Sequence, residues 1–285
     1  MASKYIALPK GVSEQTFDAA VTDFRRVLGE ANVLTSAYQL ASYTKIMMPV
    51  PEANHTPSAA ILATTVEQIQ EIVGICNKHK VPIWTISTGK NLGYGSAAPA
   101  ERGQMVLDLH RMNRILEVDA DLCYALVEPG VTYRQLYDYF QEHQLPLWLS
   151  VPAPSAIAGP TGNTLDRGVG YTPYGEHFMN ACGMEVVLAN GEVLRTAMGG
   201  LPNSNTWQVF KWGYGPYLDG IFTQSNYGIV TKFGFWLMPA PPVYKPFQIQ
   251  YQDEGDIVEI VETIRPLRIS GTIPNSVVIA HALYE

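Results

Sequence analysis

Cysteine is scarce in this chain of 285 residues, which contains only 3 of them: Cys76, Cys123 and Cys182. A small disulfide-stabilised domain needs an even set of cysteines, so the sequence excludes that class of protein. No group of cysteine and histidine residues has the spacing of a structural zinc site. We therefore expect buried free thiols and no structural metal.

Charged residues are also few, at 16% of the chain, and the net charge of -7 argues against nucleic acid or an anionic membrane surface as a partner. No apolar run reaches the length of a membrane span, and residues 1–11 lack the pattern of a secretory signal peptide. These absences predict a protein without membrane insertion and favour a cytoplasmic location. Hydrophobic residues, at 47%, suffice for a sizeable core in more than one folding unit.

Two common phosphate-binding motifs are missing as well. The chain has no G-x-x-x-x-G-K-[ST] sequence, and no G-x-G-x-x-G that opens a helix after a strand. Instead, a polar loop with three glycines, Ile86–Ser96, lies between the apolar runs Pro82–Ile86 and Met105–Leu109. Glycines leave backbone N–H groups accessible to a large anion. The loop therefore predicts an anion site that is neither a P-loop nor a Rossmann turn.

Apolar periodicity organises the first third of the chain. Residues 13–28 predict a helix with Phe17, Val21, Phe24 and Leu28 on one face, with Ser13 as its N-cap and Gly29 as its end. Residues 58–64 and 82–86 predict strands. The helix between them begins with a T-x-x-Q capping box at residues 65–68 and carries Val66, Ile69, Val73 and Cys76 on its inward face. Together these residues predict a strand–helix–strand unit.

The rest of the chain predicts mixed strands and helices. Residues 118–127 predict strands around a turn, and a second capping box (Thr132 to Gln135) opens a helix with Tyr133, Leu136, Tyr137 and Phe140 on its apolar side. Residues 184–196 predict a hairpin with a type I′ turn at Asn190-Gly191. A helix over residues 256–265 is expected to stop at Pro266, and residues 275–284 read as a strand. The architecture is therefore α+β. Because the chain stops inside an apolar run, we expect its second lobe to be incomplete.

Four glycine-bearing stretches could meet on one extended ligand. They are Ser87–Ser96, Glu128–Thr132, Pro152–Tyr171 and Asn226–Thr231. Each stretch alone is explained by ordinary turns. Together with Pro57-Ser-Ala-Ala60, Thr65-Val-Glu-Gln68 and Gly183-Met-Glu-Val-Val-Leu-Ala-Asn-Gly191, their order resembles the vanillyl-alcohol oxidase/p-cresol methylhydroxylase flavoproteins. The segment Pro152-Ala-Pro-Ser-Ala-Ile-Ala158 is most similar to the p-cresol methylhydroxylase (4-cresol dehydrogenase) branch.

The resemblance implies an FAD enzyme with a p-cresol methylhydroxylase-type FAD-binding domain (two α/β subdomains) and a cap domain. It places an N-terminal helix and connection at residues 1–56, the FAD-binding domain at 57–241, and the beginning of the cap at 242–285. It implies the following cofactor-binding residues: His55, Ser87, Thr88, Gly89, Lys90, Asn91, Leu92, Gly93, Pro129, Gly130, Val131, Thr132, Ser155, Gly162, Asn163, Arg167, Gly168, Gly228, Ile229 and Val230. The residue that attaches flavin covalently in this family is not expected within this chain.

The resemblance also implies a reaction. A para-alkylphenol binds as a phenolate, hydride passes from its benzylic carbon to flavin N5, and water adds to the resulting quinone methide. Tyr94 matches the tyrosine that hydrogen-bonds the phenol oxygen, and we assign Asp166 and Tyr171 to the same catalytic group. Further implied partners are a c-type cytochrome and a second copy of the full-length protein, and a periplasmic location is compatible with them.

Several alternatives stay open at this point. His55 fits either the edge of the flavin or an ordinary loop, and Lys90 fits either a phosphate or solvent. Asp166-Arg167 fits a structural ion pair or a pair that orients the flavin, in preference to a role in proton transfer. Residues 151–158 lack the aspartate that the oxidase branch carries near N5, which favours a dehydrogenase over an oxygen-using phenol oxidase. A non-catalytic flavin-binding module is the third reading, and the sequence does not specify which phenol is the substrate.

Overall fold

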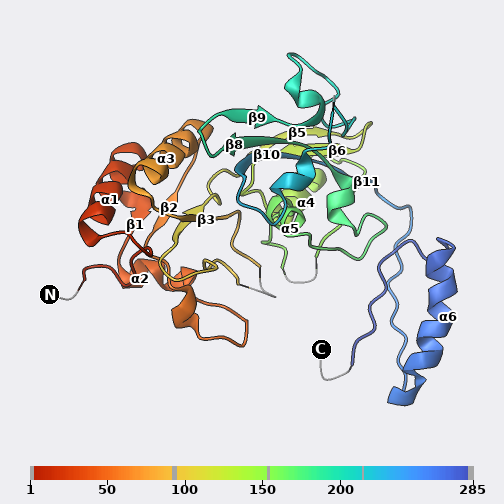
Figure 1. The fold of residues 1–285 in the computed structure, drawn as a ribbon. Helices are drawn as coiled ribbons and strands as arrows, with labels where there is room; N and C mark the ends of the chain where they lie inside the picture. Colours follow the sequence, from red (N-terminus) through yellow and green to blue (C-terminus); the bar gives the residue numbers. More distant parts are fainter. Residues whose placement is uncertain (1–2, 92–94, 153–154, 214, 282–285) are drawn as a thin grey trace.

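The computed structural model describes residues 3–91, 95–152, 155–213 and 215–281. In these ranges the chain forms two sheet-and-helix layers side by side, with a C-terminal arm beside the second layer (Figure 1). The N-terminus lies at the outer edge of the first layer, far from the C-terminal arm. Segments from both layers can meet where the two layers adjoin, so a binding site built from both would lie there.

The first sheet has four strands in the order β1 (Val33–Leu34), β2 (Ala60–Leu62), β4 (Met105–Asp108) and β3 (Ile83–Ile86). Strands β2 and β3 each pair in parallel with β4, and β1 pairs antiparallel with β2. The predicted strand–helix–strand unit is present as β2, α3 (Val66–His79) and β3. Its two strands are not neighbours, because β4 lies between them.

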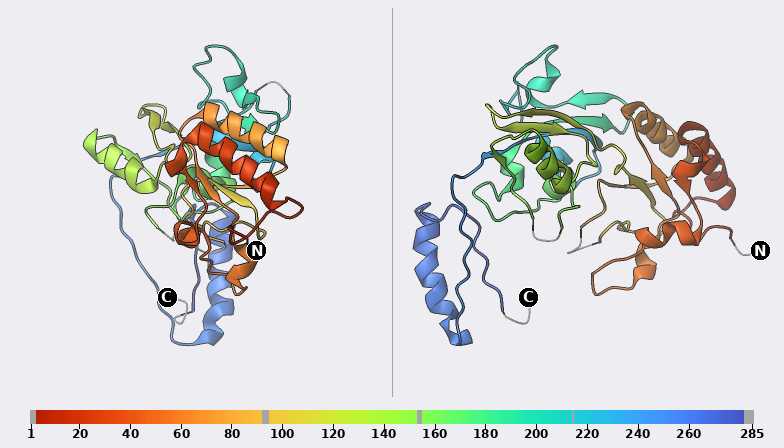
Figure 2. Two further views of the ribbon diagram at one scale, coloured as in Figure 1. Left: turned by 90° about the vertical axis from the view of Figure 1, so that its left-hand side faces the viewer. Right: turned by 180° about the vertical axis from the view of Figure 1, so that it is seen from behind.

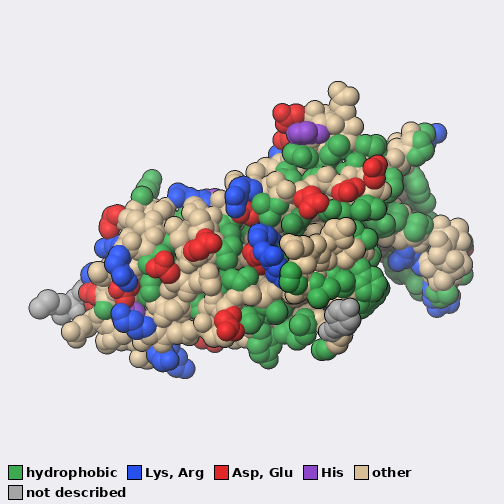
Figure 3. Space-filling model, turned by 90° about the horizontal axis from the view of Figure 1, so that it is seen from above, with side chains coloured by type: hydrophobic (Ala, Val, Ile, Leu, Met, Phe, Trp, Pro, Cys, Tyr) green, Lys and Arg blue, Asp and Glu red, His purple; other side chains and the backbone are tan. Residues whose placement is uncertain are grey.

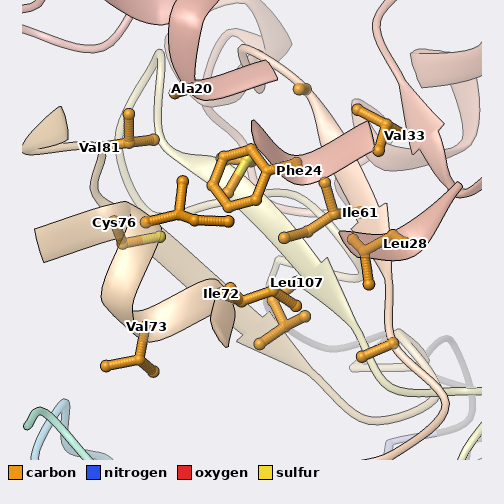
Figure 4. Packing of buried hydrophobic residues seen from close by; sticks show 14 of the residues in the cluster. Ala20, Phe24, Leu28, Val33, Ile61, Ile72, Val73, Cys76, Val81 and Leu107 are labelled. Carbon is orange, nitrogen blue, oxygen red and sulfur yellow. The ribbon is translucent and has the colours of Figure 1, made fainter. Parts of the chain in front are cut away.

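Helices α1 (Glu14–Leu28) and α3 cover one face of this sheet. The predicted cap of α1 is confirmed, since the Ser13 hydroxyl accepts a hydrogen bond from the Thr16 N–H and Gly29 follows with a φ of 82°. The apolar faces of both helices meet the strands around Phe24, Ile61 and Ile72 (Figure 4), and all three side chains are fully buried.

The cap of α3 and one of the three cysteines differ from the sequence expectations. Thr65 caps α3, but Gln68 Oε1 accepts from the N–H of Thr64 at 2.8 Å, so the reciprocal half of the predicted box is shifted by one residue. Cys76 is a buried free thiol, as expected, and burial raises its pKa to about 12. Cys182 is likewise buried, whereas Cys123 is partly exposed.

The second sheet is antiparallel, in the order β5 (Ile115–Asp119), β6 (Tyr124–Val127), β10 (Gly228–Trp236), β8 (Ala181–Leu188) and β9 (Val193–Arg195). Helix α4 (Tyr133–Glu142) packs on it through Leu136 and Phe140. A two-stranded sheet of β7 (Leu147–Trp148) and β11 (Met238–Pro239) completes this layer. Tyr137 is 50% exposed, so its predicted place on the apolar side of α4 is wrong.

The hairpin between β8 and β9 forms where predicted, but with a different turn. A type I′ turn needs positive φ at both central residues, whereas Gly191 has a φ of 86° and Asn190 does not adopt positive φ. The N–H of Gly191 donates to the Leu188 carbonyl at 2.8 Å, and the N–H of Leu188 donates to Glu192. This pattern is a type I turn closed by a left-handed glycine.

Helix α3 also connects the two layers. The Asn77 side-chain amide donates to the Ala189 carbonyl at 2.7 Å, and Gln70 donates to the Gly191 carbonyl. Val187 and Ile229, from the second sheet, belong to the first hydrophobic core. The two layers are thus held together along α3.

The short helices α2 (Ala37–Leu40) and α5 (Pro160–Leu165) flank the layers, and α6 (Ile257–Ile269) forms most of the arm. Figure 2 shows the arm apart from both sheets, and none of the α6 residues is buried. Pro266 lies inside α6 instead of ending it. The strand predicted for residues 275–284 is absent from the described part, residues 275–281.

The surface carries both signs of charge. Over the face shown in Figure 3, Lys and Arg side chains are interspersed with Asp and Glu. In the described ranges, no helix combines the length and hydropathy of a membrane span, and no group of three or more His, Cys, Asp or Glu side chains is placed to hold a metal ion.

A candidate cofactor site between glycine loops

Three of the four glycine stretches meet between the two layers. They are the turn after β3 (residues 87–91), the segment before α4 (residues 128–132) and the start of α5 (residues 159–162). A Cβ added at Gly162 would lie 2.1 Å from Ser87 Oγ. A Cβ at Gly159 would lie 2.8 Å from the Val131 carbonyl oxygen and 3.1 Å from Thr88 Cγ2. The Val131 carbonyl therefore leaves room only for glycine at position 159, and the Ser87 side chain fills the space beside Gly162.

The turn after β3 presents consecutive backbone N–H groups. Among the described residues, no acceptor takes a hydrogen bond from the N–H of Ser87, Thr88, Gly89 or Lys90. Gly89 has a φ of 65°, and a Cβ there would lie 2.9 Å from Ala97 Cβ, so the turn requires glycine. Such a run of free amides can bind a large anion without a metal.

The start of α5 adds donors to the same place. Pro160 has no N–H, and in the described part of the chain the N–H groups of Thr161 and Gly162 donate to no protein acceptor. The Thr161 hydroxyl is buried and likewise has no hydrogen-bond partner among the described residues. These groups fit an anionic ligand such as the diphosphate of a dinucleotide, because buried polar groups require partners.

The buried carboxylate of Glu128 fixes the position of the segment before α4, residues 128–132. Glu128 is 2% exposed, and it accepts hydrogen bonds from the Arg114 backbone N–H at 2.9 Å and from the Arg114 guanidinium at 2.6 Å. The Gly130 N–H donates to the Met112 carbonyl at 2.7 Å. The sequence alone assigns Glu128 no role, because its partner Arg114 lies 14 residues earlier in the chain, before β5.

Comparisons with known proteins identify the fold as one that binds FAD. The family described as "FAD binding domain" matches residues 57–197. The 4-cresol dehydrogenase [hydroxylating] flavoprotein subunit of Pseudomonas putida is 69% identical over 278 residues, which are 98% of this chain and 53% of that protein.

Solved structures give the same answer for the fold. The crystal structure of p-cresol methylhydroxylase with substrate bound has a TM-score of 0.95 at 68% identity, covering 98% of this chain and 54% of that one. A 4-ethylphenol oxidase from Gulosibacter chungangensis, in an isoeugenol complex, has a TM-score of 0.88 at 40% identity, covering 93% of this chain and 51% of that one. The chain belongs to the p-cresol methylhydroxylase type of FAD-binding proteins.

This assignment confirms the α+β fold class and FAD as the cofactor. The chain spans about half the length of the relatives it matches, with 53% of the Pseudomonas subunit covered. The structure also brings together, within the FAD-binding fold, the predicted cofactor residues Ser87, Thr88, Val131 and Gly162.

Asp166 and Arg167 do not form the structural ion pair that was one sequence interpretation. Asp166 accepts a hydrogen bond from the side-chain amide of Asn91, which joins the end of α5 to the turn after β3. Arg167 donates through Nε to the Thr223 hydroxyl at 2.9 Å, and its guanidinium lies 4.0 Å from the centre of the Phe178 ring. Desolvation by surrounding protein raises the pKa of the Asp166 carboxyl.

The fourth glycine stretch joins the site indirectly. Gly228, Ile229 and Val230 lie in β10, paired with β8, and the side chains of Ile229 and Val230 are buried in the two cores. The loop before them reaches α5, because the Gln224 N–H donates to the Leu165 carbonyl at 2.9 Å. Contact of these three residues with FAD stays a prediction.

Other predicted site residues have defined surroundings. His55 Nδ1 lies 2.9 Å from the Pro99 carbonyl oxygen, just after the glycine-rich loop. The Ser155 hydroxyl accepts from the Ile157 N–H at 3.2 Å, and Tyr171 is 42% exposed. Lys90 is exposed. Tyr94, Leu92 and Gly93 lie outside the described residues, so their roles stay predictions.

Thr132 offers a direct test of one supporting element. Its hydroxyl accepts from the Gln135 N–H at 3.1 Å, and Gln135 Oε1 accepts from the Thr132 N–H at 2.9 Å, which confirms the second capping box. We expect Thr132→Ala to lower the free energy of unfolding by about 1 kcal/mol, whereas Thr132→Ser keeps the cap. Urea unfolding followed by circular dichroism checks this. Equal losses in both variants would contradict it.

Proposed function

We propose that this chain is the FAD-binding part of an oxidoreductase that oxidises para-alkylphenols, with residues 57–241 as the FAD-binding domain and residues 242–285 as the beginning of a cap over the substrate. The observation that carries the proposal is a run of backbone N–H groups, from Ser87 to Lys90, that donate to no acceptor in the described ranges and that lie close to Gly159 and Gly162 at the start of α5. The name of the Pseudomonas relative, a 4-cresol dehydrogenase, supplies the substrate class.

In this proposal the chain binds FAD through its backbone. The N–H groups of residues 87–90 and 161–162 bind the diphosphate, because they donate to no acceptor among the residues that the structure describes. The predicted set around them, Pro129, Gly130, Ser155, Asn163 and Gly168, lines the remainder of the cofactor. When bound, FAD supplies a two-electron acceptor next to the substrate.

The chain's own residues would then prepare the phenol. Tyr94 donates a hydrogen bond to the phenol oxygen and so favours the phenolate, whose negative charge assists hydride loss from the benzylic carbon. Removal of hydride leaves a quinone methide. Water adds to its benzylic carbon and loses a proton, which yields the benzylic alcohol. Asp166 and Tyr171 are the proposed polar groups near this chemistry.

The electron acceptor distinguishes two versions of the function. The first is a dehydrogenase that passes electrons to a c-type cytochrome, as part of an oligomer. It is supported by the absence of an acidic residue from residues 151–158. The second is an oxygen-using phenol oxidase, supported by the 40% identity to a 4-ethylphenol oxidase.

The test uses the full chain incubated with FAD and desalted. We expect bound flavin absorbance that acid precipitation releases, and reduction of an artificial dye when 4-cresol is added. Tyr94→Phe, the matched control, should keep the flavin and lower the dye-reduction rate about tenfold through loss of one hydrogen bond. Retention of no flavin would overturn the proposal. Bound flavin that 4-cresol does not reduce would favour a non-catalytic module, and peroxide formation in air would favour the oxidase.

A further inference from the structure

His177 is a buried histidine next to the proposed flavin site. It begins a short 3-10 helix (His177–Asn180) and is 6% exposed. Its Nδ1 is hydrogen-bonded to the carboxamide oxygen of Asn163 on α5, and its Nε2 lies 3.0 Å from the Ser150 hydroxyl after β7. One imidazole therefore joins α5 to a separate segment of the chain.

At two glycines, Gly168 and Gly170, the backbone lies directly against the hydrogen-bonded row of Asn163, His177 and Ser150. A Cβ at Gly168 would lie 2.3 Å from Asn163 Nδ2. A Cβ at Gly170 would lie 2.5 Å from Ser150 Oγ and 2.6 Å from His177 Nε2. The loop of residues 168–170 is thus supported by the row, and any change in the orientation of the Asn163 amide would move this loop.

The protonation state of the imidazole follows from its surroundings. Desolvation by burial lowers the pKa of His177 to about 4, so the ring is neutral at pH 7 and carries one N–H. The ring of Tyr133 lies beside it, with the centroids 6.5 Å apart, and Tyr174 lines the same small cavity of about 20 Å³. A carboxamide oxygen only accepts, so Nδ1 carries the hydrogen and Nε2 accepts from Ser150.

We propose that His177 is a positioning residue of the flavin site: through Nδ1–H it fixes the carboxamide of Asn163, with the amide nitrogen beside Gly168. The inference rests on the proposed function in one respect, namely that Asn163 faces FAD. In free histidine the Nε2–H tautomer predominates, so the opposite tautomer at His177 is a specific consequence of this geometry.

The test separates the two ring nitrogens with a matched pair of variants. His177→Asn places an amide nitrogen near the position of Nδ1 and keeps a donor for Asn163. His177→Gln reaches toward the position of Nε2 and loses that donor. We expect the dissociation constant for FAD, measured by flavin fluorescence, to rise about tenfold in His177→Gln and less than about twofold in His177→Asn. Ser150→Ala should resemble His177→Asn.

A readout without FAD keeps this inference distinct from the proposed function. Nitrogen-15 NMR of the imidazole in the FAD-free chain should show Nδ1 protonated and Nε2 unprotonated. The Nε2–H tautomer would overturn the inference, and so would equal FAD affinities in the two histidine variants at equal free energies of unfolding. If the unaltered chain fails to bind FAD, the proposed function falls, while the NMR result still decides the tautomer.

Discussion

Gly130→Ala is expected to abolish FAD binding and to lower the free energy of unfolding by about 2 to 3 kcal/mol, the cost of forcing an extra methyl group into a packed interior. A Cβ at this position would lie 2.5 Å from the Leu109 carbonyl oxygen and 2.6 Å from that of His110. Both atoms belong to the backbone that follows β4, so no side-chain rotation relieves the contact. The segment before α4 must therefore shift away from residues 109–110, which changes its position at the candidate site.

The same substitution at Gly74 is the control. Gly74 lies inside α3, and a Cβ there has no heavy atom within 4 Å. Gly74→Ala should therefore leave FAD affinity unchanged and stabilise the chain by up to about 1 kcal/mol, because alanine favours a helix over glycine. Urea unfolding measures the free energy of unfolding of both variants, and titration with FAD measures their affinity for the cofactor. Equal behaviour of the two would show that the close approach at Gly130 has no influence on the site.

Local signals in the sequence predict much of the fold correctly. Ser13 and Thr132 form the predicted side-chain caps, because such hydrogen bonds depend on residues three positions apart. Local sequence signals predict less well where a helix ends and which type of turn a hairpin adopts. Pro266 lies within α6, although a proline there removes one N–H donor and its ring crowds the carbonyl of residue i−4, so the residue type alone does not decide where this helix ends. The turn at Asn190 is type I, within a hairpin that α3 contacts at Ala189 and Gly191.

In the candidate site, too, some features follow from local sequence and others depend on contacts between distant residues. The glycine content of residues 87–96 predicts an anion site, and family resemblance supplies FAD. Composition and spacing alone do not place Gly162 against Ser87, because those residues are joined only through the packing of two layers. Glu128 stays hidden for a related reason. A buried carboxylate looks like a surface residue until its partner, Arg114, is located.

Acid is expected to destabilise the chain through His177 by about 2 to 3 kcal/mol between pH 7 and pH 4.5. The pKa of the imidazole falls from 6.5 in the unfolded chain to about 4 in the folded chain. Between these values the unfolded state binds a proton that the folded state does not, so stability falls as the pH falls. Below pH 4 both states bind the proton, and this histidine causes no further loss.

His177→Asn isolates this contribution, because it removes the titrating group and keeps the donor to Asn163. Asp166 and Asp219 act with the opposite sign, since desolvation raises the pKa of both carboxyls and the folded state then binds their protons first. The comparison therefore uses the difference between the unaltered chain and the variant in urea unfolding at pH 7 and pH 4.5. We expect the unaltered chain to lose about 2 to 3 kcal/mol more than the variant. Parallel losses would mean that the imidazole is protonated in the folded chain. Nδ1–H would still donate to Asn163, but Nε2 would donate to the Ser150 hydroxyl instead of accepting from it, which contradicts a neutral ring whose single N–H is at Nδ1.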